Sequence, residues 1–431
     1  MNILLLGSGG REHAFAWKIN KSAHCKTLWI APGNAGTHAL GQNISIAVDD
    51  FPGISNFCQE QEVHLLVVGP EQPLVNGLRD FLAGDPKTAG IPIVGPGKAG
   101  AQLEGSKDFS KEFMRENGIP TASYATFTED RLQEGINYLK TQNLPIVLKA
   151  DGLAAGKGVL ICASLSEAEA SLKEMLVGHK FGEASSKVVV ETFLEGIELS
   201  VFVATDGENY KILPEAKDYK RIGEKDTGPN TGGMGAISPV PFADAGFMKK
   251  VEEKVVQPTI KGLKKAGIDF RGFLFIGLMN MKGEPYVIEY NVRMGDPETQ
   301  AVLPRIESDF VELLQAIAEK KLDHYKLQTA SAKTATVVMV AGGYPGAYEK
   351  GKIISGLEKP GPDQTITFHA GTLATGSGAV ATNGGRVLGI TGLGETTEEA
   401  IGSAYERVNQ ISWEMVNFRR DIGQDILELG N

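Results

Sequence analysis

Short apolar runs rich in leucine, isoleucine and valine recur through roughly the first hundred residues, and several lead into turns of glycine, asparagine and glutamate. Runs of this length bounded by turns are typical of buried strands. They span residues 2–6, 28–31, 44–48, 64–68 and 91–94. A helical pattern through Ile19 follows the first run, so the segment predicts a doubly wound parallel sheet. Ligands of such sheets bind outside the carboxyl ends of the strands, where these turns would gather.

The first of these turns, Gly7-Ser8-Gly9-Gly10-Arg11-Glu12, leads into the predicted helix. A helix N-terminus suits a bound anion, because its free backbone N–H groups point toward the ligand. The turn does not match a dinucleotide fingerprint, since Glu12 replaces the third glycine and the run at 28–31 ends without an acid for a ribose. The pattern favours a phosphate site for a ligand smaller than a dinucleotide, and a tight turn without a ligand is the alternative.

A glycine-rich loop between two apolar runs, 146–148 and 158–162, lies in the middle of the chain. Glycines let a backbone approach a polyphosphate closely, and lysines supply positive charge. The spacing is one residue short of a P-loop and lacks its Ser/Thr, and the run that follows has the pattern of a strand. The segment predicts a flap over the phosphates of a nucleotide, with a glycine-rich hairpin of no chemical role as the alternative. The residues concerned are Lys149, Gly152, Gly156, Lys157 and Gly158.

A second candidate site comes from residues 285–292, where side chains are expected to alternate between two faces of a strand. One face would carry Tyr286, Ile288, Tyr290 and Val292, and the other Glu289, Asn291 and Arg293. Two oxygen ligands in line with a guanidinium suit Mg²⁺ and a transferring phosphoryl group. Taken alone, residues 289–293 are better explained as a solvated polar face, but the block that follows at 294–300 weakens that explanation.

Two further segments are expected to contact substrates. The strand at 188–190 runs into Glu191-Thr192-Phe193-Leu194, whose backbone groups could hydrogen-bond an adenine. An acid further on, Glu198, could reach the hydroxyls of a ribose. A solvated acidic face is the alternative for these acids. The charged run at 217–221 precedes a glycine-rich loop at 226–235, which we expect to order when a substrate binds.

Length and composition narrow the class of protein. A chain of 431 residues suggests about three domains. We expect their boundaries at 1–103, 104–325 and 326–431, with a lid at about 120–192 inside the second. The third is expected to be rich in strands and to pack beside the active site without chemistry of its own.

The formal net charge of −10 argues against nucleic acid or an anionic membrane as the main partner. The three cysteines have neither disulfide nor zinc spacing, and the seven histidines form no HExxH or other ligand cluster. A bound metal would therefore be held by carboxylates, which favours Mg²⁺. No apolar run reaches 18 residues, and the first residues lack the basic start of a signal peptide. We therefore expect a cytoplasmic protein.

Taken in order, these stretches resemble the glycinamide ribonucleotide synthetase (phosphoribosylamine–glycine ligase) family of the ATP-grasp superfamily. The block EYNVRMGDPETQ at 289–300 is the most specific match. The others are GSGGREHA at 7–14, PGNAGT at 32–37, VVGPEQPL at 67–74, LKADGLAAGKGV at 148–159, DTGPNTGGMG at 226–235, GGYPG at 342–346 and TNGGRVLG at 382–389. Met294 stands where the family more often has Phe, and Lys217 where Gln is frequent. The resemblance implies an α/β chain with a doubly wound N-terminal domain, a central ATP-grasp domain with a mobile lid, and a small β-rich C-terminal domain.

The resemblance also implies a reaction. ATP would phosphorylate the carboxylate of glycine, and the amine of 5-phosphoribosylamine would then attack the glycyl phosphate to give glycinamide ribonucleotide, ADP and phosphate. This is a step of purine biosynthesis that depends on Mg²⁺ or Mn²⁺ and acts on small molecules. Positioning and charge neutralisation would suffice for it, without a protein nucleophile. We further expect a monomer.

Residue roles follow from the resemblance by matching position. Glu289 and Asn291 would be the metal ligands, with the catalytic candidates Arg293, Asp296 and Asp218 near glycine and the acyl phosphate. The nucleotide would be held by Lys107, Lys149, Gly152, Gly156, Lys157, Gly158, Glu191, Phe193, Leu194 and Glu198. The remaining substrate contacts would come from Gly9, Gly10, Arg11, Asn34, Glu71, Lys217 and Gly295.

Three rival functions are distinguishable by sequence. Another ATP-grasp carboxylate–amine ligase or carboxylase would share the flap and the Glu289/Asn291 pair but not the block at 294–300. A nicotinamide-dependent dehydrogenase would need the missing third glycine and ribose acid. A non-catalytic nucleotide-binding module would not need two metal ligands aligned with Arg293.

Overall fold

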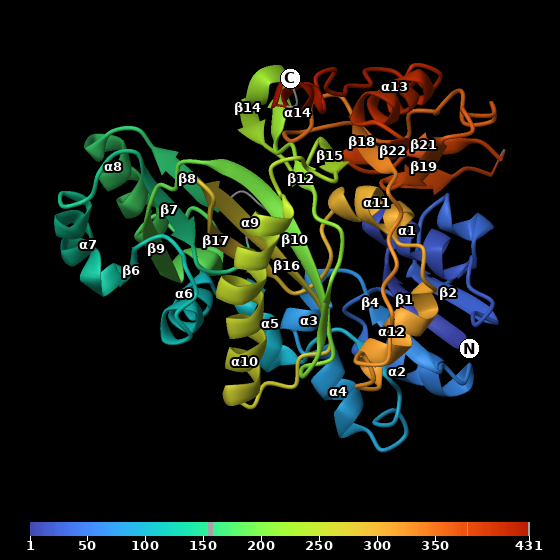
Figure 1. Cartoon of the computed structure of the whole chain (residues 1–431), viewed down its shortest axis with the longest axis horizontal. Helices are drawn as coiled ribbons and strands as arrows, with labels where there is room; N and C mark the ends of the chain where they lie inside the picture. Colours follow the sequence, from blue (N-terminus) through green and yellow to red (C-terminus); the bar gives the residue numbers. More distant parts are fainter. Residues whose placement is uncertain (154–157, 377, 430–431) are drawn as a thin grey trace.

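The computed structural model describes residues 1–153, 158–376 and 378–429. Its layers are four main sheets with helices packed on them, which confirms the expected α/β class (Figure 1). The N-terminal sheet lies at lower right in that view, a small sheet from the middle of the chain at left, and the C-terminal sheet at upper right. Among the helices in the described residues, none combines the length and the apolar character needed to cross a membrane.

The N-terminal sheet is parallel throughout, in the order β3-β2-β1-β4-β5. Its strands are β1 (Asn2–Gly7), β2 (Thr27–Pro32), β3 (Gln42–Asn43), β4 (Leu65–Val68) and β5 (Ile93–Val94). The helices around it are α1 (Gly10–Ile19), α2 (Phe51–Glu60), α3 (Glu71–Val75), α4 (Leu78–Gly84), α5 (Lys98–Gly105) and α12 (Phe310–Ala318). Ile3 and Leu5 of β1 enter one buried cluster, while Leu4 and Leu6 enter another. Both faces are therefore covered, as the uninterrupted apolar runs require.

The predicted strand at 44–48 is wrong. β3 ends at Asn43, and the residues after it form a loop. Ile44, Ile46 and Val48 nevertheless pack, partly buried, against the core. Apolar residues at every second position here belong to a loop that lies on the core. Periodicity alone does not distinguish such a loop from a strand paired in a sheet.

The middle of the chain forms two antiparallel sheets. The smaller has the order β6-β9-β7-β8 and packs against α7 and α8. Its elements are β6 (Tyr124–Thr128), α7 (Leu132–Leu139), β7 (Ile146–Ala150), β8 (Val159–Cys162), α8 (Leu165–Leu176) and β9 (Lys187–Thr192). The larger has the order β11-β10-β16-β17, with strands β10 (Ile197–Thr205), β11 (Tyr210–Ile212), β16 (Gly272–Met281) and β17 (Glu284–Asn291). The helices of this part are α6 (Lys107–Glu116), α9 (Ala245–Val251), α10 (Gln257–Lys265) and α11 (Glu298–Val302).

A β-bulge in β17 corrects one predicted face. Gly277 pairs with Glu289 and Leu278 with Val287, so Ile288 is the extra residue. The extra residue reverses the alternation, because two positions then face one partner. Val287 before the bulge and Tyr290 after it both enter the core, and Tyr286 and Ile288 do not share a face with Tyr290 as expected. Glu289 and Asn291 flank the buried Tyr290 beyond the bulge, so alternation directs both to the face opposite the core.

The C-terminal sheet, in the order β12-β15-β18-β22-β19, is covered by α13 (Thr397–Val408). Its strands are β12 (Lys217–Asp218), β15 (Gly235–Ser238), β18 (Lys333–Val340), β19 (Thr365–His369) and β22 (Arg386–Gly394). Smaller elements are the pairs β13 (Arg221–Gly223) with β14 (Thr227–Asn230) and β20 (Thr372–Ala374) with β21 (Val380–Thr382), and α14 (Gln424–Leu429). Two strands from the middle of the chain thus join a sheet made otherwise of C-terminal residues, and the loop at 226–235 runs between them.

Candidate active site

The loop from β1 into α1 is built around Glu12, the residue that departs from a dinucleotide fingerprint. Its Oε2 accepts a hydrogen bond from Gly9 N–H (2.7 Å). The side chain passes so close to Gly7 that a Cβ there would lie 2.3 Å from Glu12 Cγ, and one on Gly69 would lie 2.2 Å from Oε1. Gly7 also has a φ of +124°, which side chains rarely tolerate. Glu12 therefore fixes the loop from within and occupies space that a dinucleotide fold leaves to its third glycine.

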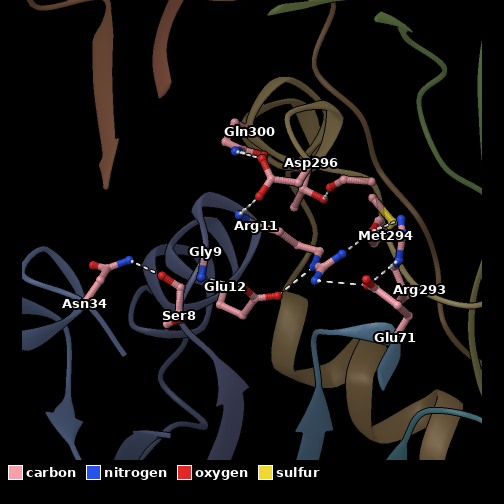
Figure 2. Close-up of polar contacts among 12 residues, drawn as sticks. Ser8, Gly9, Arg11, Glu12, Asn34, Glu71, Arg293, Met294, Asp296 and Gln300 are labelled. Carbon is pink, nitrogen blue, oxygen red and sulfur yellow. Dashed lines mark hydrogen bonds and ion pairs between the residues drawn. The ribbon is translucent and has the colours of Figure 1, made fainter. Parts of the chain in front are cut away.

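The guanidinium of Arg11 points inward, toward residues of other elements (Figure 2). Nε lies 2.6 Å from Glu12 Oε1, Nη1 donates to the Met294 carbonyl (3.1 Å) and Nη2 is 4.0 Å from Glu71 Oε2. Arg11 is 7% exposed. The structure thus places this predicted phosphate ligand in a buried network, with its charge already shared between two carboxylates.

That network continues through Arg293. Arg293 Nε lies 3.3 Å from Glu71 Oε2, and Nη2 lies 2.6 Å from Glu104 Oε1. The other oxygen of Glu104 accepts Val292 N–H (2.8 Å). Burial would raise the pKa of Glu71, but Arg293 and Arg11 outweigh it and hold that pKa below its usual value. Positive and negative groups therefore alternate from α1 to the end of β17 and fix Arg293 in place.

Asp296 lies at the start of α1, although it comes from the far end of the chain's central part (Figure 2). Its Oδ2 is 3.4 Å from Arg11 N, and its Oδ1 accepts Gln300 Nε2 (2.8 Å). Arg386, at the start of β22, donates to the Asp296 carbonyl (2.5 Å) and to the Gly232 carbonyl of the glycine-rich loop (2.6 Å). Burial would raise the pKa of Asp296, and the charges of Arg386 and Arg11 lower it overall. One arginine thus joins the C-terminal sheet, the glycine-rich loop and a predicted catalytic carboxylate.

Asn34 uses its amide to join the N-terminal and C-terminal parts. Nδ2 donates to the carbonyls of Ser8 and His369 (both 2.9 Å), and Oδ1 accepts N–H groups from Gly36 and Thr37. A buried amide with both ends engaged shapes the loop. Asn34 therefore lies beside the predicted phosphate loop, and Gly9 and Gly10 form the start of α1 next to Asp296 and Gln300.

The nucleotide half of the site centres on a buried carboxylate between two lysines. Glu191 Oε2 lies 2.9 Å from Lys111 Nζ and 3.0 Å from Lys149 Nζ. Lys149 also donates to the Ile288 carbonyl (3.2 Å), and Lys107 donates to the Gly152 carbonyl (3.1 Å). The predicted lysines, Lys107 of α6 and Lys149 of β7, thus both lie near Glu289 of β17.

The remaining nucleotide candidates lie around that cluster. Phe193, 41% exposed, and half-buried Leu194 occupy the segment between β9 and β10. Glu198 Oε2 lies 2.5 Å from Lys220 Nζ. Gly158 accepts a hydrogen bond from Ala150 N–H (2.8 Å). The predicted flap residues Gly156 and Lys157 lie outside the described residues.

Glu289 lies near these lysines. Burial alone would raise the pKa of Glu289, but the charges of Lys220, Lys149 and Lys107 bring it below its usual value. No group of three histidine, cysteine or acidic side chains with metal-site geometry occurs in the part of the chain that the structure describes. One carboxylate and one amide fit a Mg²⁺ or Mn²⁺ ion that completes its oxygen shell with phosphate and water.

Glu298, the first residue of α11, is a buried acid. Burial, and next the charge of Asp218, raises the pKa of Glu298 to about 8. Burial likewise raises the pKa of Asp218, whose Oδ1 is 4.0 Å from Lys220 Nζ. The Glu298 carboxylate lies against Gly295, where a Cβ would be 2.4 Å from Oε2. Gly295 is therefore required by this close approach.

Two predicted positions have clear structural roles. Lys217 Nζ lies 2.7 Å from Asp425 Oδ2 and over the ring of Tyr219, so its ammonium is engaged with the C-terminal segment. Met294 is fully buried in the core, and its carbonyl accepts a hydrogen bond from Arg11. An apolar side chain of similar size suits that position.

Sequence reasoning missed four residues that contact this site: Glu104, Lys111, Lys220 and Arg386. Lys220 and Arg386 lay inside stretches singled out as a charged run and as TNGGRVLG, which was a usable signal. Glu104 and Lys111 lie on helical faces with no local signal, because their partners come from distant strands. The C-terminal part was expected to carry no chemistry of its own, yet it places Arg386 on Asp296.

Comparison with known proteins finds one family along nearly the whole chain. Three family models match: the phosphoribosylglycinamide synthetase N domain over residues 1–104, its ATP-grasp (A) domain over 105–299 and its C domain over 334–425. A phosphoribosylamine–glycine ligase of Vibrio vulnificus is 49% identical over 427 residues, covering 98% of each chain. That of Escherichia coli K12 is 46% identical over 431 residues, covering 99% of each.

Solved structures give the same result. The crystal structure of phosphoribosylamine–glycine ligase from Thermotoga maritima has a TM-score of 0.85 and 37% identity, and covers 98% of this chain and 100% of that one. The biotin carboxylase of Campylobacter jejuni has a TM-score of 0.73 at 15% identity, covering 96% of this chain and 92% of that one, and shows the fold alone. The chain belongs to the phosphoribosylglycinamide synthetase family, the family that its ordered motifs resemble.

Proposed function

We propose that this protein is a phosphoribosylamine–glycine ligase, which joins glycine to 5-phosphoribosylamine at the expense of ATP in purine biosynthesis. The observation that carries the proposal is the full-length match at 46–49% identity to ligases of that name. Other ATP-grasp reactions are not favoured, because the biotin carboxylases share only the fold, at 15–17% identity. ATP, glycine and phosphoribosylamine are then the small-molecule substrates.

The first chemical step is phosphoryl transfer. A carboxylate oxygen of glycine attacks the γ-phosphorus, the bond to the β-γ bridging oxygen breaks, and ADP leaves. In the proposal, Lys107 and Lys149 bind the phosphates, helped by the loop from Gly152 to Gly158. The lysines already hold Glu289 ionised, so the metal face is ready without a proton leaving first. Glu289 and Asn291 would hold Mg²⁺ or Mn²⁺, which supplies charge neutralisation at the transferring phosphoryl group.

The second step is acyl transfer. The amine of phosphoribosylamine attacks the carbonyl carbon of glycyl phosphate, phosphate leaves with the former glycine oxygen, and the amine loses a proton. Arg293, held between Glu71 and Glu104, would bind the acyl phosphate. The start of α1 at Gly9 and Gly10, with Asn34 beside it, would receive phosphoribosylamine. Arg11, Glu71, Asp218, Lys217, Gly295 and Asp296 are proposed to shape this pocket.

Three coarser features belong to the same proposal. We place the domain boundaries at 1–103, 104–325 and 326–431, and the lid at about 120–192, because β6 to β9 form one sheet there. We propose that the protein is cytoplasmic and monomeric. Sedimentation would test the monomeric state.

The test is ADP formation from purified protein, ATP and Mg²⁺, measured with glycine alone, with phosphoribosylamine alone, and with both. ADP and glycinamide ribonucleotide in equal amounts, formed only with both substrates, is the expected result. Sustained ADP formation with bicarbonate, or with glycine and a different amine but not phosphoribosylamine, would contradict the proposal.

A further inference from the structure

The strand β17, which carries the proposed metal ligands, is weakly held within its own sheet. It is the last strand in the order β11-β10-β16-β17. The bulge at Ile288 interrupts its pairing with β16 just before Glu289. Glu289 itself lies opposite Gly277, which has no side chain to pack against it. Because cross-strand side-chain pairs stabilise a sheet, this stretch of β17 needs another anchor.

Tyr290, which lies between Glu289 and Asn291, supplies that anchor on the core side. Its side chain is 2% exposed and belongs to a buried cluster formed by β10, β16 and the helical segment 245–265. Its ring meets the ring of Phe113 edge to face, with the two centroids 6.5 Å apart. Because side chains alternate along a strand, a side chain held in the core fixes the direction in which its two neighbours point.

The hydroxyl of Tyr290 begins a short chain of buried hydrogen bonds. Thr259 Oγ1 donates to the Val255 carbonyl (2.7 Å) and lies 2.7 Å from Tyr290 Oη. Since Thr259 has a single hydroxyl hydrogen, Tyr290 donates and Thr259 accepts. Burial raises the pKa of Tyr290, so the phenol keeps the proton that it donates. The chain therefore has a fixed direction, from Tyr290 through Thr259 to Val255.

The carbonyl at the end of that chain lies in an irregular turn of helix. Residues 252–256 form a π-helical turn between α9 and α10. Pro258, two residues further on, has no N–H to donate to that turn. Turns of this kind are rare and occur frequently at functional sites. Apolar contacts are non-directional, whereas a hydrogen bond has a preferred length and angle, so this bond ties β17 to one defined place on the helix.

We infer that Tyr290 is a positioning residue, whose hydroxyl holds Glu289 and Asn291 in the geometry that binds the divalent cation. Metal sites lose affinity when the groups that orient their ligands are removed. Tyr290 itself is buried in the core and acts only through its two neighbours in the strand. The inference rests on the proposed function, which makes Glu289 and Asn291 the metal ligands.

The test is the dissociation constant of Mn²⁺ from the complex of the protein with ADP, measured from the electron paramagnetic resonance signal of the free ion. Glu289→Gln removes a proposed ligand and should weaken Mn²⁺ binding most. Tyr290→Phe removes a single oxygen atom and should raise the dissociation constant roughly three- to tenfold, the range for one buried hydrogen bond. Thr259→Val removes the acceptor of the same bond and should have a similar effect.

The two partners should act as one unit. Because both single variants break the same hydrogen bond, the double variant should bind Mn²⁺ no more weakly than the weaker single variant. Tyr325→Phe is the matched control: Tyr325 is 7% exposed, its hydroxyl donates to Ser308 Oγ (2.7 Å), and it belongs to a different buried cluster. Loss of that hydroxyl should lower the free energy of unfolding and leave the affinity for Mn²⁺ unchanged.

Normal Mn²⁺ affinity in Tyr290→Phe, beside a loss in Glu289→Gln, would overturn the inference. So would an equal loss in the Tyr325→Phe control, losses that simply add in the double variant, or normal affinity in Thr259→Val if Tyr290→Phe does not fold. Unchanged affinity in Glu289→Gln would overturn the metal assignment as well. Binding needs no ligation, so Mn²⁺ affinity that depends on Tyr290 in a protein that makes no glycinamide ribonucleotide would refute only the proposed function.

Discussion

At the scale of single residues, the site depends on buried charges whose partners come from other elements. Glu71 lies between Arg11 and Arg293, and Glu289 faces three lysines. A buried charge is tolerated only when it is paired, so each of these groups constrains its neighbours. The residues proposed to bind substrates are therefore already held in place in the free protein.

Glu289→Gln is expected to lower turnover by roughly a hundredfold or more at saturating Mg²⁺. The substitution removes the only carboxylate of the proposed metal face, and a bound cation contributes several kcal/mol to stabilising charge on the phosphoryl group. Steady-state kinetics would measure it. Glu284→Gln, at the half-buried start of the same strand, is the control and should retain normal turnover. Similar rates in both variants would remove Glu289 from the metal site.

Glu298 is expected to make folding stability depend on pH. Burial, and next Asp218, raises its pKa from 4.5 to about 8, so between these values the folded state holds a proton that the unfolded state has lost. Stability from this group is therefore fully present below about pH 4.5 and is lost as the pH rises toward 8. In denaturant titrations between pH 4.5 and 8, the free energy of unfolding of Glu298→Gln should fall less with rising pH than that of the wild type. Parallel curves would show that Glu298 ionises normally.

At the scale of elements, sequence periodicity predicted most strands and helices, and its errors have physical causes. The helical pattern expected to run through Ile19 is α1 (Gly10–Ile19), which ends at that residue. The bulge at Ile288 reverses the faces of the residues that follow it in β17. A single extra residue leaves no signature in the alternation of apolar and polar positions, so the sequence did not predict it. The loop at 44–48 imitates a strand because Ile44, Ile46 and Val48 lie on the core.

The N-terminus of α13 offers a direct test of local stability. Thr396 accepts a hydrogen bond from Glu399 N–H, and the Glu399 side chain accepts one from Thr396 N–H, which forms a capping box. Thr396→Ala should lower the free energy of unfolding by about 1 kcal/mol. Thr397→Ala, one position further on, removes no cap and serves as the control. Equal denaturation midpoints for the two variants would mean that the box contributes nothing.

At the scale of the whole molecule, segments far apart in the sequence meet at the site, which is why part of it could not be predicted. The motifs predict Glu289, Asn291 and Lys149 as site residues from local sequence alone. The contacts of Glu104 with Arg293, and of Lys111 with Glu191, join helices to distant strands and leave no local pattern. Arg386 reaches Asp296 only because two strands around the glycine-rich loop pair into the C-terminal sheet.

Arg386→Gln is expected to raise the KM for phosphoribosylamine roughly tenfold or more while nucleotide binding stays unchanged. The variant loses the donor that Asp296 and Gly232 share at the start of α1, whereas the lysines around Glu191 are untouched. Substrate-specific Michaelis constants would measure it, with the largely exposed Arg420→Gln as the control. A raised KM for ATP alone would contradict this prediction, because it would mean that Arg386 supports the nucleotide site and not the phosphoribosylamine site.

The central claim, ligation through a glycyl phosphate, is tested most directly with glycine labelled with ¹⁸O in both carboxylate oxygens. Because one of those oxygens attacks the γ-phosphorus and leaves with the phosphate, the account predicts one ¹⁸O in each phosphate released and one in the amide of glycinamide ribonucleotide. Mass spectrometry of the phosphate measures this transfer. Product formation with unlabelled phosphate would contradict the account.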